Sequence, residues 1–401
     1  MTPTNSPMPL MLHTNSNGKD IQIHTPSSGS NLTPPVTPVG KEIDDSDRST
    51  PSSIHHELDE PATLRQNVCT PLRFTDELEI CRDAEERPIE FGRGAWSIVY
   101  KARATPSTGP MYTPPSSPAA GTRVYAVKAP LRRDARPVLQ AEALTLTRLH
   151  FMRDHERYVV PFHGFHTDTK ALVMTAVPLA LSTYIEDQAD LARKRPVSTA
   201  TMFDPIQGPD SWRDMACKLI SGLAWLHSKG SIFHGDIKPH NLLLRTLPTD
   251  EPGVEVGAFP YEPLLADFSS ALDICGGGPI DANRASYSAF TPPFTAPELL
   301  SLTALKAGTV APSPASDVFS LAATLVAAAT GDLLLYPGFN SMQRLAMARD
   351  GHQILNFTRS GPNAARVPRN GFVERLIQPA VAKDPAQRIA ATEWAALASS
   401  V

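Results

Sequence analysis

The sequence predicts an α+β protein in which short strands come first and longer helices follow. Residues 88–103 read as strand, tight glycine turn and strand, and residues 123–129 alternate in the period of a strand. Later in the chain, residues 212–227 have the apolar spacing of an amphipathic helix, and the alanine-rich run 317–330 fits a closely packed buried helix. The chain has 401 residues and 41% apolar side chains, which is enough to bury a core over most of its length.

A short loop after the amphipathic run has the residues of a phosphoryl-transfer loop. Residues 234–241 read His-Gly-Asp-Ile-Lys-Pro-His-Asn. In such a loop Asp236 can accept or orient a hydroxyl proton, Lys238 can neutralise a moving phosphoryl group, and Asn241 can hold a magnesium ion. Acidic and amide residues are also ordinary turn formers, so the interpretation needs support from the rest of the chain.

That support comes from four further segments in a consistent order. They are a glycine turn at Gly92, a lysine at the end of a strand at Lys128, an Asp-Phe pair at 267–268 and an Ala-Pro-Glu sequence at 296–298. Together with the loop they resemble the eukaryotic protein kinase family. The lysine two residues after the catalytic aspartate is typical of the serine/threonine type, whereas Gly235 stands where the family usually has arginine.

The resemblance implies a two-lobed protein kinase fold over residues 86–401, with a small, mainly antiparallel β lobe and a larger helical lobe. Three stretches, about 104–122, 193–208 and 245–263, would be insertions or loops between elements. The resemblance also implies ATP and Mg²⁺ as cofactors and proteins as substrates. We expect a monomer.

The glycine turn is expected to cover the nucleotide. Gly92 and Gly94 would let the backbone approach the phosphates, and Val99 would lie over the adenine. Ser97 replaces the third glycine of the family pattern. The other residues of the turn expected to line this part of the site are Phe91, Arg93, Ala95, Trp96 and Ile98.

A buried ion pair is expected to hold the phosphates. By resemblance Lys128 grips the α and β phosphates and pairs with Glu142 on the predicted helix 138–149. A lysine that ends a strand is commonly solvated, and a glutamate on an amphipathic helix commonly lies on the surface. The two positions together favour the paired role. The resemblance further assigns Ala126, Thr175, Val177 and Leu243 to the adenine side of the site.

The second half of the chain supplies the remaining expected residues. Asp267 would bind magnesium, and Thr291 would form a hydrogen bond near the catalytic aspartate. The family joins the positions of Glu298 and Arg388 in a buried ion pair, and its counterpart of Asp317 anchors the backbone of the catalytic loop.

Two alternatives remain open at this stage. Ser97, Gly235 and Ser269 depart from the family pattern, which allows a pseudokinase that binds nucleotide or serves as a scaffold. None of these changes removes a residue expected to contact phosphate or metal. A kinase of small molecules would share the nucleotide site but would not need the peptide-binding loop from Thr291 to Glu298.

Residues 1–72 are expected to form a disordered tail, because their Pro-, Ser- and Thr-rich composition cannot bury a core. Proline-directed kinases could modify the tail at its Thr-Pro or Ser-Pro pairs, although such a composition also produces these pairs by chance. The pairs begin at Thr2, Ser6, Thr25, Thr33, Thr37, Thr50 and Thr70.

Composition excludes several classes of protein. A formal net charge of −4 gives no general attraction for nucleic acid or anionic lipid. The four cysteines lack the spacing of a disulfide framework or a zinc site, which suits a reducing compartment. The N-terminus has no secretory pattern, and the most apolar window, 321–335, is shorter than the roughly 20 residues that span a bilayer. We therefore expect an intracellular protein, cytoplasmic or nuclear, without nucleic-acid or membrane partners.

Overall fold

The computed structural model describes residues 69–105, 123–195, 198–247, 257–274, 291–301 and 312–401. All of these belong to one compact unit. The expected disordered tail therefore lies outside the described residues up to position 68. The same holds for most of the insertion at 104–122, and for residues 248–256 of the insertion at 245–263.

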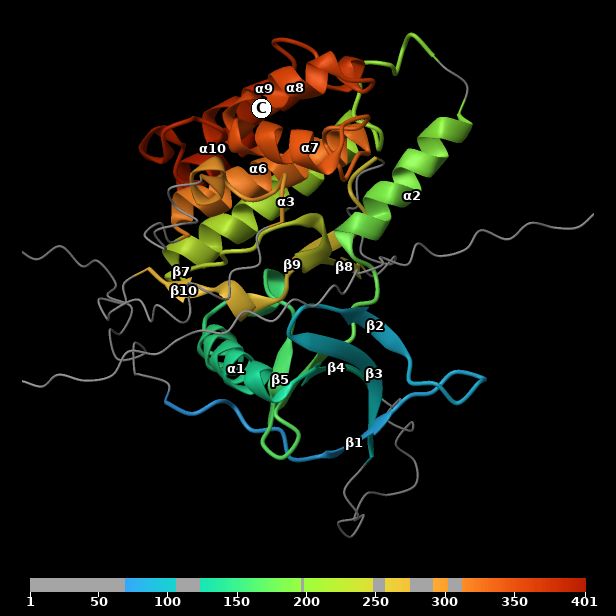
Figure 1. Cartoon of the computed structure of the whole chain (residues 1–401), viewed down its shortest axis with the longest axis vertical. Coiled ribbons are helices and arrows are strands. Elements are labelled where there is room, and N and C mark those ends of the chain that lie inside the picture. Colours follow the sequence, from blue (N-terminus) through green and yellow to red (C-terminus); the bar gives the residue numbers. More distant parts are fainter. Residues whose placement is uncertain (1–68, 106–122, 196–197, 248–256, 275–290, 302–311) are drawn as a thin grey trace, which may run out of the picture. The chain divides into compact units, whose positions relative to one another are not determined.

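A six-stranded antiparallel sheet and one long helix, α1 (Arg136–His150), form the smaller lobe (Figure 1). The strand order is β1-β3-β4-β6-β5, and β2 pairs with β3 beside β1. The bounds of the strands are β1 (Glu77–Ile80), β2 (Glu90–Arg93), β3 (Ser97–Thr105), β4 (Val124–Pro130), β5 (Phe162–His166) and β6 (Ala171–Thr175). Because β1 pairs with β3, the sheet begins before the predicted domain boundary at residue 86.

Strand β4 is buried on both faces, and this explains where Lys128 comes to lie. Tyr125 and Val127 pack into a small cluster on one face of the sheet, whereas Ala126 and Lys128 lie on the other face. The second face is covered by α1, whose apolar residues Leu139, Leu146 and others recur at helical spacing and are buried. Glu142 lies on this buried face of α1 as well.

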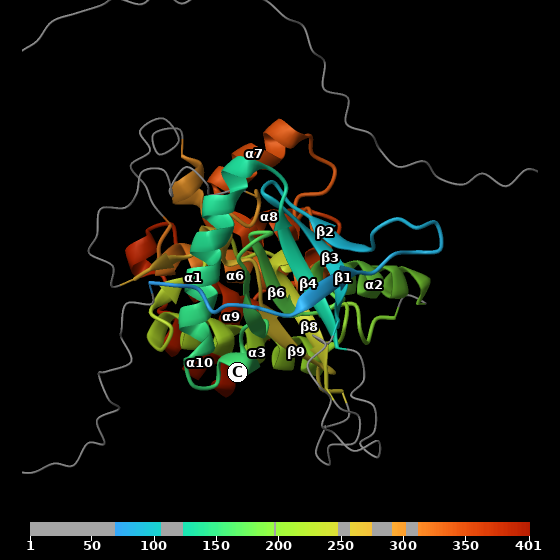
Figure 2. The same cartoon turned by 90° about the horizontal axis from the view of Figure 1, so that it is seen from below.

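The segment from Cys69 to Phe74, which we call the N-terminal strap, crosses α1 (Figure 2). It also pairs with β5 at Phe165. Leu72 N–H donates to Thr147 Oγ1 on α1 (2.8 Å), and Phe165 N–H in β5 donates to the Leu72 carbonyl (2.7 Å). Phe74 N–H donates back to the Phe165 carbonyl (3.1 Å). The predicted tail extended to residue 72, so the structure corrects its end: Leu72 is held by the folded domain.

Gly164 makes this approach possible. It has a φ of +141°, and a Cβ atom at this position would lie 2.8 Å from the backbone of Arg73 and of Phe74. Thr70, one of the seven predicted sites for a proline-directed kinase, is exposed at the start of the strap. The other six lie outside the described residues.

Helices make up most of the larger lobe (Figure 1). Helix α6 is buried along nearly its whole length, and α3 packs against both α6 and α10. Ser313 caps α6 in a reciprocal pair with Ser316, and Gly331 ends the helix with a φ of +75°. The helices are α2 (Leu181–Lys194), α3 (Pro209–Ser228), α6 (Pro314–Thr330), α7 (Ser341–Arg349), α8 (Ile354–Ser360), α9 (Phe372–Ile377) and α10 (Ala391–Ser400).

Two small antiparallel sheets flank the predicted phosphoryl-transfer loop. Strand β7 (Ile232–Phe233) precedes the loop and pairs with β10 (Leu272–Asp273), whereas β8 (Leu242–Thr246) follows it and pairs with β9 (Tyr261–Leu265). The predicted insertion at 245–263 is thus shorter than expected, because its two ends belong to the β8–β9 hairpin.

Within the described ranges, no helix is both long and apolar enough to cross a membrane. Cys81 and Cys217 are free cysteines that form no disulfide bond.

Candidate active site

Lys128 lies between two carboxylates at the junction of the lobes. Its Nζ atom donates to both oxygens of Glu142, at 2.8 and 2.7 Å, and to Oδ1 of Asp267 at 2.8 Å. The Lys128 and Glu142 side chains are only 6% and 1% exposed. The predicted pair therefore forms, and it joins β4, α1 and the segment after β9 at one point.

Charge stabilises this arrangement. Burial alone would lower the pKa of Lys128, but the neighbouring carboxylates of Asp267 and Glu142 outweigh it and raise the pKa above its ordinary value. Burial would likewise raise the pKa of Asp267, but Lys128 and the hydrogen bond from Ser269 hold it well below its usual range. Asp267 is thus a carboxylate at neutral pH, as a metal ligand must be.

The loop at residues 234–241 brings the predicted acid, base and amide together. Lys238 Nζ lies 2.6 Å from Asp236 Oδ2 and 3.2 Å from Thr291 Oγ1. Asn241 Nδ2 donates to the Asp236 carbonyl (2.8 Å) and to Oδ2 (3.0 Å). Burial raises the pKa of Asp236, and Lys238 opposes this shift. A basic carboxylate is thereby oriented beside a cation and a hydroxyl.

Asp317 anchors the start of this loop. Its carboxylate accepts hydrogen bonds from the backbone N–H groups of His234 (2.6 Å) and Gly235 (2.9 Å), and it lies 3.0 Å from His227 Nε2. Asp317 is 1% exposed, so these three groups satisfy a carboxylate that has little access to water. The sequence predicted the backbone anchor but not the contribution of His227.

The close packing around Gly235 explains why this position is a glycine. Its φ is +80°, and a Cβ atom would lie 2.5 Å from the carbonyl oxygen of Ser270. A side chain at this position would therefore require both a left-handed backbone and a displacement of the segment after Asp267. The glycine before Asp236 is thus coupled to a close approach between the two loops.

The turn after Asp267 packs inward. Phe268 is 1% exposed, its ring lies 4.8 Å from that of His234, and its N–H donates to Glu142 Oε1 (3.1 Å). Ser269 Oγ donates to Asp267 Oδ1 (2.7 Å), so the serine that replaces the usual glycine bonds to the predicted metal ligand. Asp267 itself has a φ of +62°.

The glycine turn closes on itself between β2 and β3. Gly94 N–H donates to the Ser97 carbonyl (2.8 Å), and the guanidinium of Arg132 lies 5.2 Å from the Trp96 ring. Phe91 is exposed, whereas Ile98 is buried. On the adenine side, Ala126 pairs with Met174 across β4 and β6. Val177 and Leu243 are half-buried against the main core.

The two predicted ligands would suit magnesium. Asp267 would supply a carboxylate and Asn241 a side-chain amide oxygen, and hard oxygen donors of this kind are the ones Mg²⁺ prefers. Among the described residues no group of three His, Cys, Asp or Glu side chains could hold a metal. A Mg²⁺ ion held by these two residues would need phosphate oxygens and water as its remaining ligands.

The predicted ion pair of the large lobe also forms. Both terminal nitrogens of Arg388 donate to Glu298, at 2.8 and 2.7 Å, and Arg388 Nη1 also donates to the Ala315 carbonyl (2.9 Å). The Arg388 side chain is fully buried. This bidentate pair fixes the end of the loop that begins at Thr291 against α6, and it specifies position rather than adding much stability.

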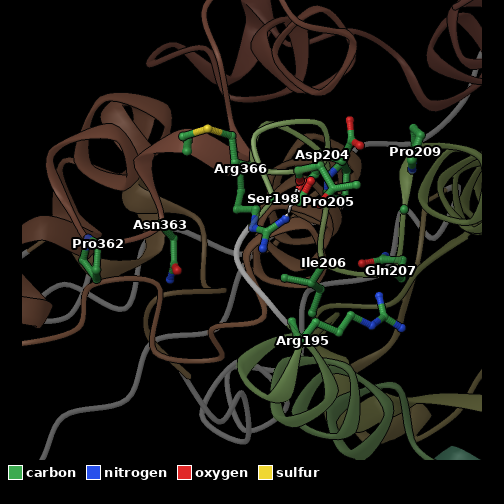
Figure 3. A pocket seen from close by; sticks show the side chains of 15 residues that line it. Arg195, Ser198, Asp204, Pro205, Ile206, Gln207, Pro209, Pro362, Asn363 and Arg366 are labelled. Atoms are coloured by element: carbon green, nitrogen blue, oxygen red, sulfur yellow. Dashed lines mark hydrogen bonds between the residues drawn. The ribbon is translucent and has the colours of Figure 1, made fainter.

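A cavity of about 730 Å³ lies between the connection from α2 to α3 and residues 362–366 (Figure 3). Arg366 Nη1 donates to the carbonyls of Thr201 (3.0 Å) and Asp204 (2.8 Å) on its wall. The predicted loop 193–208 is anchored here too, because Ile206 is buried and its N–H donates to the Ala329 carbonyl. None of the predicted site residues lines this cavity.

Comparison with known proteins gave two findings. The family model described as the protein kinase domain matches residues 118–397, which is more than half of the chain. Proteins named serine/threonine-protein kinase PknK from Mycobacterium tuberculosis and Mycobacterium bovis are 33% identical to the chain over 185 residues. The matched segment covers 45% of this chain but only 14% of each relative.

Proposed function

This chain belongs to the protein kinase family, and on that premise we propose that it transfers the γ-phosphoryl group of ATP to serine or threonine hydroxyls of protein substrates. The observation that carries the proposal is the position of Lys238 Nζ between Asp236 Oδ2 and Thr291 Oγ1. A substrate hydroxyl placed beside Asp236 would meet a base and a cation at the same time, which is what phosphoryl transfer requires.

Each part of the site has a role in this proposal. Bound MgATP would supply the phosphoryl group, with the metal neutralising the charge of the phosphates. Asp267 and Asn241 would hold the metal, and Lys128, kept in place by Glu142, would bind the α and β phosphates. Asp236 would orient the attacking hydroxyl and take its proton.

The proposal of a protein hydroxyl as the acceptor is supported by the loop from Thr291 to Glu298. Thr291 begins the loop that Glu298 and Arg388 fix in place, and its hydroxyl already bonds to Lys238. A kinase of small molecules would not need this loop. The PknK relatives are named serine/threonine-protein kinases, which supports the same choice.

A second function is favoured by one contact. Asp267 Oδ1 already accepts from both Lys128 and Ser269, so one oxygen of the predicted metal ligand is engaged. A pseudokinase that binds nucleotide without transferring phosphate would fit this arrangement.

The deciding experiment is a transfer assay with γ-labelled ATP, Mg²⁺ and generic protein substrates, run beside Asp236→Asn. We expect label on phosphoserine or phosphothreonine with the native chain and a loss of at least about a hundredfold with the variant, since general base catalysis contributes at least this much. MgATP binding without transfer, with native and variant alike, would establish the pseudokinase. Label on phosphotyrosine would contradict the proposed specificity.

A further inference from the structure

Arg148, in the last turn of α1, reaches across to the large lobe. Its Nη1 atom forms an ion pair with Asp273 Oδ2, and its Nη2 atom donates to the carbonyls of Gly230 (2.7 Å) and Ser231 (3.3 Å). The side chain is 28% exposed, so more than two thirds of it is covered. One guanidinium thus contacts two separate segments of the large lobe.

Both segments lead directly into the catalytic centre. Gly230 and Ser231 form the turn from α3 into β7, and β7 continues into the loop that carries Asp236. Asp273 belongs to β10, which follows the turn at Asp267 and pairs with β7. Arg148 therefore binds this two-stranded ribbon at its outer end.

The α3–β7 turn comes very close to α1. A Cβ atom at Gly230 would lie 2.6 Å from the Leu226 carbonyl and 3.2 Å from Leu149 Cδ2 on α1. A side chain at this position would crowd Leu149, the neighbour of Arg148 on α1. The contact is thus built from a glycine, two backbone acceptors and a carboxylate.

Arg148 lies on the same helix as Glu142, so a tether at the end of α1 also limits where Glu142 can lie. Glu142 accepts from Lys128 and from Phe268 N–H. On its other side α1 is held by the N-terminal strap through Thr147, the neighbour of Arg148. The helix is therefore fixed to the small lobe and to the large lobe within one turn.

We propose that Arg148 is a positioning residue: it holds α1 where Glu142 engages Lys128, and it does so without a phosphate group. Gly235 offers no side chain that could recruit a phosphorylated residue. The contacts of Arg148 use only a carboxylate and backbone carbonyls of the unmodified chain. The proposal rests on the proposed function, because its consequence is expressed in phosphoryl transfer.

The guanidinium suits this role better than an ammonium group. Its planar fork presents donors in two directions, toward Asp273 and toward the two carbonyls. A lysine could keep the charge but could not satisfy all three acceptors with the same geometry. Arg148→Lys should therefore retain part of the effect, and Arg148→Met none of it.

The test compares Arg148→Met, Arg148→Lys and Asp273→Asn with the native chain, before and after phosphatase treatment. Arg153→Met is the matched control, because the Arg153 side chain is 88% exposed and lies 3.8 Å from Asp154. Three kinds of measurement are made: steady-state kinetics (kcat and KM for ATP and for a peptide), the affinity for MgATP, and hydrogen exchange of residues 136–150 against 391–400.

We expect Arg148→Met to lower kcat/KM for ATP by about tenfold, or about 1.4 kcal/mol, with the peptide KM nearly unchanged. Its exchange should rise in α1 and not in α10, and phosphatase should alter none of these values. Arg148→Lys should recover only part of the loss, because its ammonium group cannot reach all three acceptors. Asp273→Asn should show a smaller loss that adds little in the Arg148→Met background, since both changes remove the same ion pair.

Native ATP kinetics and native α1 exchange in Arg148→Met would overturn the proposal. So would a fully additive double variant, or a loss of about tenfold on phosphatase treatment of the native chain. If the native chain transfers no phosphate at all, the proposed function fails separately. MgATP affinity and α1 exchange would then still decide whether Arg148 positions the helix.

Discussion

Replacing Gly235 by alanine tests whether the glycine before the catalytic aspartate is required by the backbone. At this position the chain has a φ of +80°, and the new Cβ atom would lie 2.5 Å from the Ser270 carbonyl oxygen. The matched control is Gly338→Ala. Gly338 has a φ of +83°, but nothing lies within 4 Å of its added Cβ atom. The two variants therefore share the backbone strain and differ in the steric overlap.

The expected magnitudes follow from these contacts. A left-handed non-glycine residue costs about 1–2 kcal/mol, and the lower entropy of the unfolded chain returns about 0.4–1 kcal/mol. Gly338→Ala should thus cost about 1 kcal/mol. Overlap with a backbone oxygen adds about 1–3 kcal/mol, because the Ser270 segment must shift. We expect Gly235→Ala to cost about 3 kcal/mol in free energy of unfolding.

Thermal unfolding and phosphoryl transfer measure the two consequences. At about 2 °C per kcal/mol for a domain of this size, Gly235→Ala should melt about 6 °C below the native chain and Gly338→Ala about 2 °C below it. Transfer should fall only in Gly235→Ala, because Ser270 follows the turn at Asp267. Equal melting temperatures and equal activities in the two variants would refute the steric argument.

Three further predictions follow from the site and the strap. Lys128→Met should abolish phosphoryl transfer while keeping the native circular dichroism, since a contact with phosphate charge is worth roughly 3 kcal/mol in the transition state; retained activity in a folded variant would contradict the assignment. Lys238→Met should move the acid limb of the kcat/KM profile to higher pH. Burial raises the pKa of Asp236 and Lys238 lowers it, so the pKa should rise further without Lys238. An acid limb at the same or lower pH would exclude this coupling. Deleting residues 1–68 should leave the melting temperature nearly unchanged. Deleting 1–74 should lower it by about 6 °C, since two backbone hydrogen bonds to Phe165 and one to the Thr147 hydroxyl, at about 1 kcal/mol each, are lost. Equal melting of the two shortened chains would show that the strap contributes nothing.

Those parts of the site that belong to short motifs could be predicted from the sequence. Asp236, Lys238 and Asn241 lie within one loop, so local spacing alone places them together. The pairing of Lys128 with Glu142 could be predicted because the family resemblance assigns these two positions to one ion pair. These expectations agree with the geometry, whereas the roles of the residues in binding and transfer stay predictions.

Other contacts could not be predicted because each depends on segments that are distant in sequence and carry no motif. Arg148 looks like an ordinary exposed arginine on an amphipathic helix, and only the tertiary fold brings Asp273 to it. Leu72 follows a proline in a tail-like composition, and no residue near it in the sequence indicates that its backbone bonds to Thr147 and Phe165. Gly235 could be read only as a missing guanidinium, since its φ and the approach of Ser270 arise from the packing of two loops.

The N-terminal strap also covers part of an open edge of the sheet. Strand β5 is the last strand of the sheet order, so its outer side would present unpaired backbone groups. The strap occupies that side at Phe165, where it forms hydrogen bonds with both the N–H and the carbonyl of Phe165. An open edge of this kind is a template for pairing with another chain. A protein that begins after Phe74 should therefore form aggregates at concentrations where the longer chain stays dispersed.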